Sequence, residues 1–172
     1  YFTTDPGSRI VPLEIEARRA LMDDAAEDAA RLRLEEMKAE AAPRLEVLRR
    51  FADINQLVEM NVAGALNTNL AFYKGMASAG AFGDMPEDQM LSDVWGQEDA
   101  IRAETESWLF PYLALAYGPL SDAELDGYVA FSESDAGQAL NSAIFAAFDK
   151  VFARISHDLG EAAGRHMQGE DI

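Results

Sequence analysis

The sequence predicts an all-α fold, a helical bundle. Strong helix formers such as Ala, Leu, Glu and Met dominate the 172 residues, and runs of β-branched residues with alternating polarity are absent. Apolar residues recur every three or four positions over several long stretches. Hydrophobic residues make up 49% of the chain and charged residues 26%, which is typical of a globular protein. We therefore expect a single all-helical domain over 1–172, with no β-sheet.

The first half of the chain predicts two long helices with a short one between them. A first helix over 8–41 is indicated by one continuous apolar stripe, formed by Ile10, Leu13, Ala17, Leu21, Ala25 and Leu32. Pro43 interrupts this pattern, and a short helical run over 44–50 follows. Asp53-Ile-Asn-Gln56 resembles a capping box, so we expect a second long helix over 53–79. Gly80 and Gly83 favour a chain reversal after it.

The second half predicts shorter helices and then another long one. Pro86 suits the first turn of a short helix that ends near Trp95. The next helix, from Gln97 to about 117, contains Pro111, which predicts either a kink or a break into two helices. Ser121-Asp-Ala-Glu124 is a capping box for a helix reaching about Phe131.

The last helix is predicted over 135–164, with Ser134 or Asp135 as its N-cap. Its large apolar residues follow helical spacing and are expected to face the core: Phe145, Phe148, Phe152, Ile155 and Leu159.

Two heptapeptides suggest an internal repeat. Tyr1–Gly7 aligns without a gap on Phe131–Gly137, pairing aromatic with aromatic, Thr4 with Ser134, Asp5 with Asp135 and Gly7 with Gly137. Each copy precedes a long predicted helix. We therefore expect 1–30 to be the tail of a first copy that is truncated at the N-terminus, 97–160 to be the second copy, and 43–80 to form connecting helices.

The stretch from Pro119 to Gln138 resembles the DUF2059 family of uncharacterised bacterial proteins. The matching positions are Leu120, Ser121, Glu124, Leu125, Phe131, Gly137 and Gln138. The chain departs from the family at Ser132–Ala136, where the family favours a small residue followed by proline. The resemblance implies an exported helical protein with a signal peptide, and so a periplasmic location with the leader absent from this chain. It implies no catalytic residues, since none are established for the family.

Charge and composition argue against several kinds of partner. The formal net charge is −17, and Lys74 and Arg102 are the only cations between Phe51 and Asp149. Such a surface repels phosphate backbones and anionic lipid headgroups, so we expect no nucleic-acid binding. No apolar stretch approaches the roughly 18 residues of a membrane-spanning helix, so we expect no membrane span. The chain has no cysteine and therefore no disulfide or thiol chemistry.

Motifs for catalysis or metal binding are missing. The two histidines, His157 and His166, are nine residues apart and should lie on opposite faces of one helix. There is no Glu-x-x-His pair, no calcium-loop pattern, no nucleophile elbow and no phosphate loop. The sequence thus predicts no catalytic residues, no metal site and no cofactor, and a protein that is not an enzyme.

Two functions remain open. The first is a non-enzymatic binding or interaction protein with an unidentified protein partner. The alternative is a carrier of an apolar small molecule in a pocket between helices, lined by Trp108, Tyr112, Phe148 and Phe152. A cavity of some hundreds of cubic ångströms lined by aromatic residues would favour the carrier, whereas an exposed apolar patch would favour partner binding. The sequence leaves the oligomeric state open.

Overall fold

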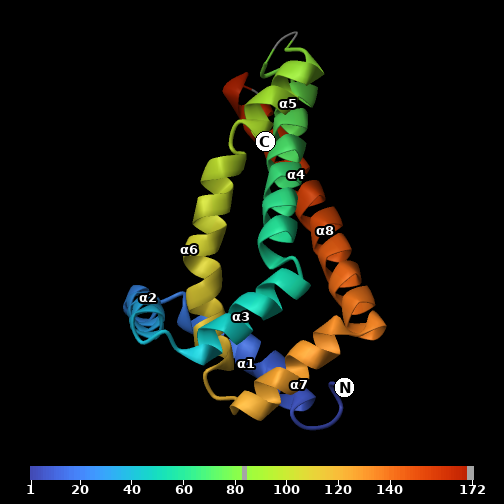
Figure 1. The fold of residues 1–172 in the computed structure, drawn as a ribbon. Helices are drawn as coiled ribbons and strands as arrows, with labels where there is room; N and C mark the ends of the chain where they lie inside the picture. Colours follow the sequence, from blue (N-terminus) through green and yellow to red (C-terminus); the bar gives the residue numbers. More distant parts are fainter. Residues whose placement is uncertain (83–84, 170–172) are drawn as a thin grey trace. The chain divides into compact units, whose positions relative to one another are not determined.

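The computed structural model describes residues 1–82 and 85–169, which contain eight α-helices and no β-strand (Figure 1). The predicted all-α class is therefore confirmed over this part of the chain. The helices are α1 (Gly7–Ala20), α2 (Asp24–Ala39), α3 (Pro43–Ile54), α4 (Leu57–Ser78), α5 (Glu87–Trp95), α6 (Glu98–Tyr117), α7 (Asp122–Glu133) and α8 (Asp135–Met167).

The chain divides into two compact units, and the single domain over 1–172 stays a prediction. The first consists of Tyr1–Val58 and Glu104–Asn141, and the second of Glu59–Ala103 and Ser142–Ile172. Helices α4, α6 and α8 each contribute residues to both units. The division does not coincide with the predicted repeat copies at 1–30 and 97–160.

The prediction of one helix over 8–41 is wrong, because the chain turns between α1 and α2. Asp23 adopts an extended conformation with φ −103° and ψ 122°, and its carboxylate accepts a hydrogen bond from the Ala26 amide at 3.1 Å. An aspartate in this position satisfies one of the free amides at the start of a helix. The apolar stripe continues on both sides of the turn, so periodicity alone did not reveal it.

The predicted start of the second long helix at Asp53 is also wrong. Asp53 lies inside α3, and the chain turns at Asn55 and Gln56, where Gln56 has a φ of +50°. The buried Asn55 side chain donates to the Phe51 carbonyl, and the Asn55 carbonyl accepts from the Asn141 amide group, both at 2.9 Å. Residues far away in the sequence thus fix this turn.

The later helices agree with the sequence. α7 begins with the predicted capping box: the Glu124 amide donates to Ser121 Oγ at 3.3 Å, and the Ser121 amide donates to the Glu124 carboxylate at 2.7 Å. Of the two outcomes predicted for Pro111, the break does not occur, since α6 continues through this buried proline. Gly83 of the predicted Gly80–Gly83 reversal lies outside the described residues.

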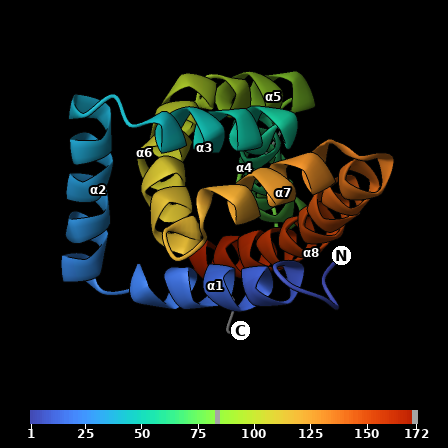
Figure 2. The same ribbon diagram turned by 60° about the horizontal axis from the view of Figure 1, so that its bottom comes forward.

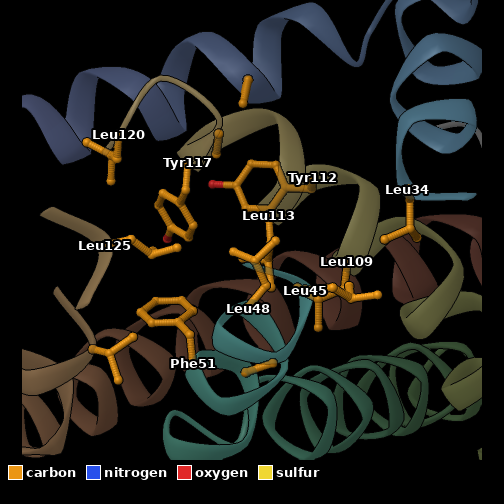
Figure 3. Packing of buried hydrophobic residues seen from close by; sticks show 14 of the residues in the cluster. Leu34, Leu45, Leu48, Phe51, Leu109, Tyr112, Leu113, Tyr117, Leu120 and Leu125 are labelled. Atoms are coloured by element: carbon orange, nitrogen blue, oxygen red, sulfur yellow. The ribbon is translucent and has the colours of Figure 1, made fainter. Parts of the chain in front are cut away.

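The first unit has a large apolar core between α1, α3, α6 and α7. Figure 2 shows α3 and α7 side by side in this unit. The side chains of Phe51, Tyr117 and Leu125 point toward one another in this core (Figure 3). Arg44 of α3 secures the end of α6, because its guanidinium donates to the carbonyls of Tyr117 and Leu120 at 2.6 and 2.7 Å.

The second unit is held together by close backbone contact between α4 and α8, which run side by side in Figure 1. A Cβ atom at Gly160 would lie 2.2 Å from the Phe72 carbonyl oxygen, and one at Gly75 would lie 2.1 Å from the His157 carbonyl oxygen. Glycine is therefore required at both positions. Among the residues of this unit that the structure describes, few large side chains are buried; they are Val62, Leu66, Met90 and Val94.

The two repeated heptapeptides have similar local structure. A Cβ atom at Gly7 would lie 2.3 Å from the carbonyl oxygen of Tyr1, and one at Gly137 would lie 2.2 Å from that of Phe131, six residues upstream in each case. The rings of Tyr1 and Phe131 stack at a centroid distance of 4.3 Å. This similarity concerns seven residues, and superposition of the longer segments stays a prediction.

Candidate functional site

Two of the four predicted pocket residues share a cavity. Trp108 and Tyr112 lie on α6 on either side of Pro111, and with it they line an open hollow of about 260 Å³ in the first unit. The remaining wall comes from α1 and α2 and their connection: Arg18, Leu21, Glu27 and Arg31. The volume is slightly below the roughly 300–1,000 Å³ of typical ligand sites.

Charged side chains lie beside the aromatic residues in the wall of this cavity. The Arg18 guanidinium lies 5.0 Å from the centre of the Tyr112 ring, and the Arg31 guanidinium pairs with the Glu27 carboxylate. Burial is the main reason why the pKa of Tyr112 lies above its ordinary value. An apolar ligand entering here would remove water from these charged groups, which costs free energy.

The other two predicted pocket residues, Phe148 and Phe152, belong to the second unit and do not line this cavity. Their side chains are 55% and 51% exposed, and their rings stack on each other at 5.8 Å. The prediction that they face the core is therefore wrong. Trp95, at the end of α5, is also exposed, at 59%.

Large exposed apolar side chains cover one side of α8. We define the α8 apolar face as Ile144, Phe148, Val151, Phe152, Ile155 and Leu159, which are between 45% and 60% exposed. Their spacing of one, three and four residues places them along a single face of a helix. Scattered single apolar residues are normal on a protein surface, whereas contiguous apolar rows are typical of interaction sites.

The opposite side of α8 explains why these residues are exposed. Gly160 and Gly164 are buried there against the backbone of α4, near Phe72 and Met76. Small residues let two helix axes approach closely, whereas Phe or Ile in the same place would hold them apart. The helix therefore packs through its small residues, and its large apolar residues remain outside.

A second cluster of polar groups lies in the first unit, around the Glu14 carboxylate. The hydroxyls of Tyr117 and Tyr128 both donate to Glu14 Oε1, at 2.8 and 3.3 Å. Burial raises the pKa of Glu14, and this effect outweighs the two hydrogen bonds and the nearby Arg18 charge, which lower it. Burial also raises the pKa of both tyrosines. The cluster is satisfied internally, which fits a structural role in the core.

Neither of these features was predicted, although each leaves a signal in the amino-acid sequence. Glu14 falls on the predicted apolar stripe of its helix, four residues after Ile10 and three before Ala17. A carboxylate in that position predicts a buried polar contact. For α8 the signal is that large apolar residues occupy one face of the helix, while small residues, among them Gly160 and Gly164, occupy the opposite face.

Other kinds of site are not found in 1–82 and 85–169. These residues contain no group of three or more His, Asp or Glu side chains placed to hold a metal ion. None of their helices is long and apolar enough to cross a membrane. Within the same ranges, every buried side-chain nitrogen and oxygen has a hydrogen-bond partner.

Comparison with known proteins adds no assignment. No protein-family model, curated protein or solved structure matches this chain. The resemblance to DUF2059 therefore stays a hypothesis drawn from the residues of 119–138. The α8 apolar face is the strongest candidate functional site among the described residues. Its apolar side chains form a continuous row that remains about half exposed to solvent.

Proposed function

We propose that this protein is a non-enzymatic protein-interaction module that binds its partner through the α8 apolar face. The observation that carries the proposal is the row of six apolar side chains, each about half exposed, on one side of one helix. Burying such a row against a partner removes apolar surface from water, which is the main driving force of protein association.

We further propose that the module acts in the periplasm as a member of DUF2059. This part rests on the resemblance of 119–138 alone, and the similar settings of Gly7 and Gly137 are in keeping with a repeated motif. Fractionation of the source bacterium with an antibody against the chain tests the location. Recovery in the cytoplasmic fraction would contradict it.

Carbene footprinting of dilute protein tests the interaction surface. We expect strong labelling of the α8 peptide that contains Phe148 and Ile155, as strong as the labelling around Met22, an isolated apolar residue that is 85% exposed. Weak labelling of the α8 peptide in a monomeric sample would mean that the face is covered within the chain. The proposal would then be wrong.

The carrier of an apolar small ligand remains the alternative, with the cavity beside Pro111 as its site. A Trp95→Phe variant leaves Trp108 as the only tryptophan, so its fluorescence reports on that cavity alone. We expect no energy transfer from Trp108 to the neutral apolar probe N-phenyl-1-naphthylamine. Saturable transfer that Tyr112→Ala abolishes would favour the carrier over the interaction module.

A further inference from the structure

We infer that the partner on the α8 apolar face is a second copy of this chain, paired antiparallel through α8 about a two-fold axis near Val151 and Phe152. The inference rests on the proposed function, because it names the partner of the same surface. Three observations carry it: the symmetry of the face, its area and its charge.

The spacing of the face reads the same in both directions. From Ile144 to Leu159 the successive steps are four, three, one, three and four residues. Two antiparallel copies therefore place Ile144 beside Leu159, and Phe148 beside Ile155, with Val151 and Phe152 on the axis. An interface between identical chains related by a two-fold axis must be complementary to itself. The row meets this condition, because its spacing is the same in both chain directions.

The area of the face agrees with a dimer. Six side chains that each expose about half of their surface leave roughly 600 Å² of apolar area per copy, so pairing would bury about 1,200 Å² in total. That is the lower end of the range for specific protein–protein interfaces. The apolar area of roughly 600 Å² on one copy also lies at the upper end of the range of about 300–600 Å² for the largest apolar patch of a typical monomer.

The charge of this segment favours contact between two copies. The chain carries −17 overall, yet the only Asp, Glu, Lys and Arg between Ile144 and Leu159 are Asp149, Lys150, Arg154 and Asp158, whose charges cancel. Asp149 is turned to α4, where its carboxylate accepts a hydrogen bond from Asn67 at 2.9 Å. Two identical chains therefore meet here with less repulsion than an acidic surface would produce.

The edges of the face also suit an interface. Arg154 precedes Ile155 by one position, which is about 100° around the helix, and Asp158 adjoins Leu159 at the end of the row. They therefore lie beside the apolar row and not within it, as charged residues do at the rim of protein interfaces.

The first test is the mass in solution of the whole chain. Light scattering behind size exclusion should give a dimer at about 50 µM, a concentration above the micromolar dissociation constants at the weak end of specific interfaces. Ile155→Glu should give a monomer with an unchanged circular dichroism spectrum, since Ile155 is exposed and its replacement leaves the interior intact. Ser92→Glu on α5 adds the same charge in the same unit and should remain a dimer.

The second test uses disulfide formation, because the chain has no cysteine of its own. Val151→Cys places a thiol next to the axis, so oxidation should link most of the protein into dimers. Lys150→Cys places a thiol at the same height but about 100° around the helix, and should link little. Equal linking of the two variants would overturn the antiparallel pairing.

The outcomes separate the inference from the proposed function. A monomeric wild type whose α8 peptide is strongly labelled by carbene would overturn the second copy as partner and leave the interaction module standing. A monomer with a weakly labelled α8 peptide would overturn both. A dimer in which α8 labelling falls as the protein concentration rises would support both.

Discussion

Glu14 shows how a single carboxylate is accommodated inside an apolar core. It lies on the buried side of α1, and two tyrosine hydroxyls from α6 and α7 donate to the same oxygen. The hydrogen bonds satisfy the group, but burial still disfavours its charged form. The raised pKa has a consequence for stability. Folding favours the protonated Glu14 carboxyl. Its contribution to the free energy of unfolding is therefore fully present below the ordinary pKa of 4.5, and it is lost as the pH rises through the higher pKa of the folded state.

The first prediction concerns this pH dependence. Glu14→Gln removes the titration, so the free energy of unfolding of the variant should rise relative to wild type between pH 4 and pH 7. Urea unfolding followed by circular dichroism measures it. Glu16→Gln, on the exposed side of the same helix, makes the same change of charge and serves as the control. A difference in the free energy of unfolding between wild type and Glu14→Gln that stays constant with pH, or that follows the control, would show that folding does not raise the pKa of Glu14.

At the scale of elements, α8 has two apolar sides, and either of them could be buried against α4. The side with large residues offers more area for burial, but the side with Gly160 and Gly164 allows α4 and α8 to bring their backbones into contact. The small residues are the ones buried in the second unit. The large ones remain exposed.

The second prediction tests this packing. Gly160→Ala should destabilise the protein by about 1–3 kcal/mol, because the added methyl group would lie 2.2 Å from the Phe72 carbonyl oxygen and the helices must separate. Gly64→Ala in α4 has no atom within 4 Å of the added methyl group and should stabilise the protein by up to about 1 kcal/mol. Thermal and urea unfolding measure both. Equal effects of the two substitutions would contradict the close contact of α4 and α8.

At the scale of the whole molecule, net charge opposes association. Two copies at −17 each repel one another, and this repulsion is screened by salt, while the contact between apolar faces is not weakened by it. Self-association should therefore increase with ionic strength, opposite to the behaviour of an interface formed by salt bridges.

The third prediction follows from that balance. Raising NaCl from about 20 to about 300 mM, across which the screening length falls below about 10 Å, should increase the dimer fraction measured by sedimentation velocity. Ile155→Glu should remain monomeric at both concentrations. A dimer that dissociates in the higher salt would indicate that charge pairs, and not the α8 apolar face, hold the two copies together.

The sequence alone determined the helical class, the capping box at Ser121 and Glu124, the extent of the last helix and the acidity that argues against nucleic-acid binding. These follow from local propensity, capping and composition, which depend on neighbours in the chain. Local signals did not reveal the turn at Asn55 and Gln56, which is held by Asn141, far along the chain.

Only the tertiary structure decided which side of α8 is buried. Periodicity identifies apolar faces, but it does not say which of two faces meets a neighbouring helix, because that depends on how closely the two backbones can approach. Here Gly75 on α4 meets α8 at His157, and Gly160 on α8 meets α4 at Phe72, so the small residues are buried. Phe148 and Phe152, predicted to face the core, lie instead on the surface that we propose binds a second copy.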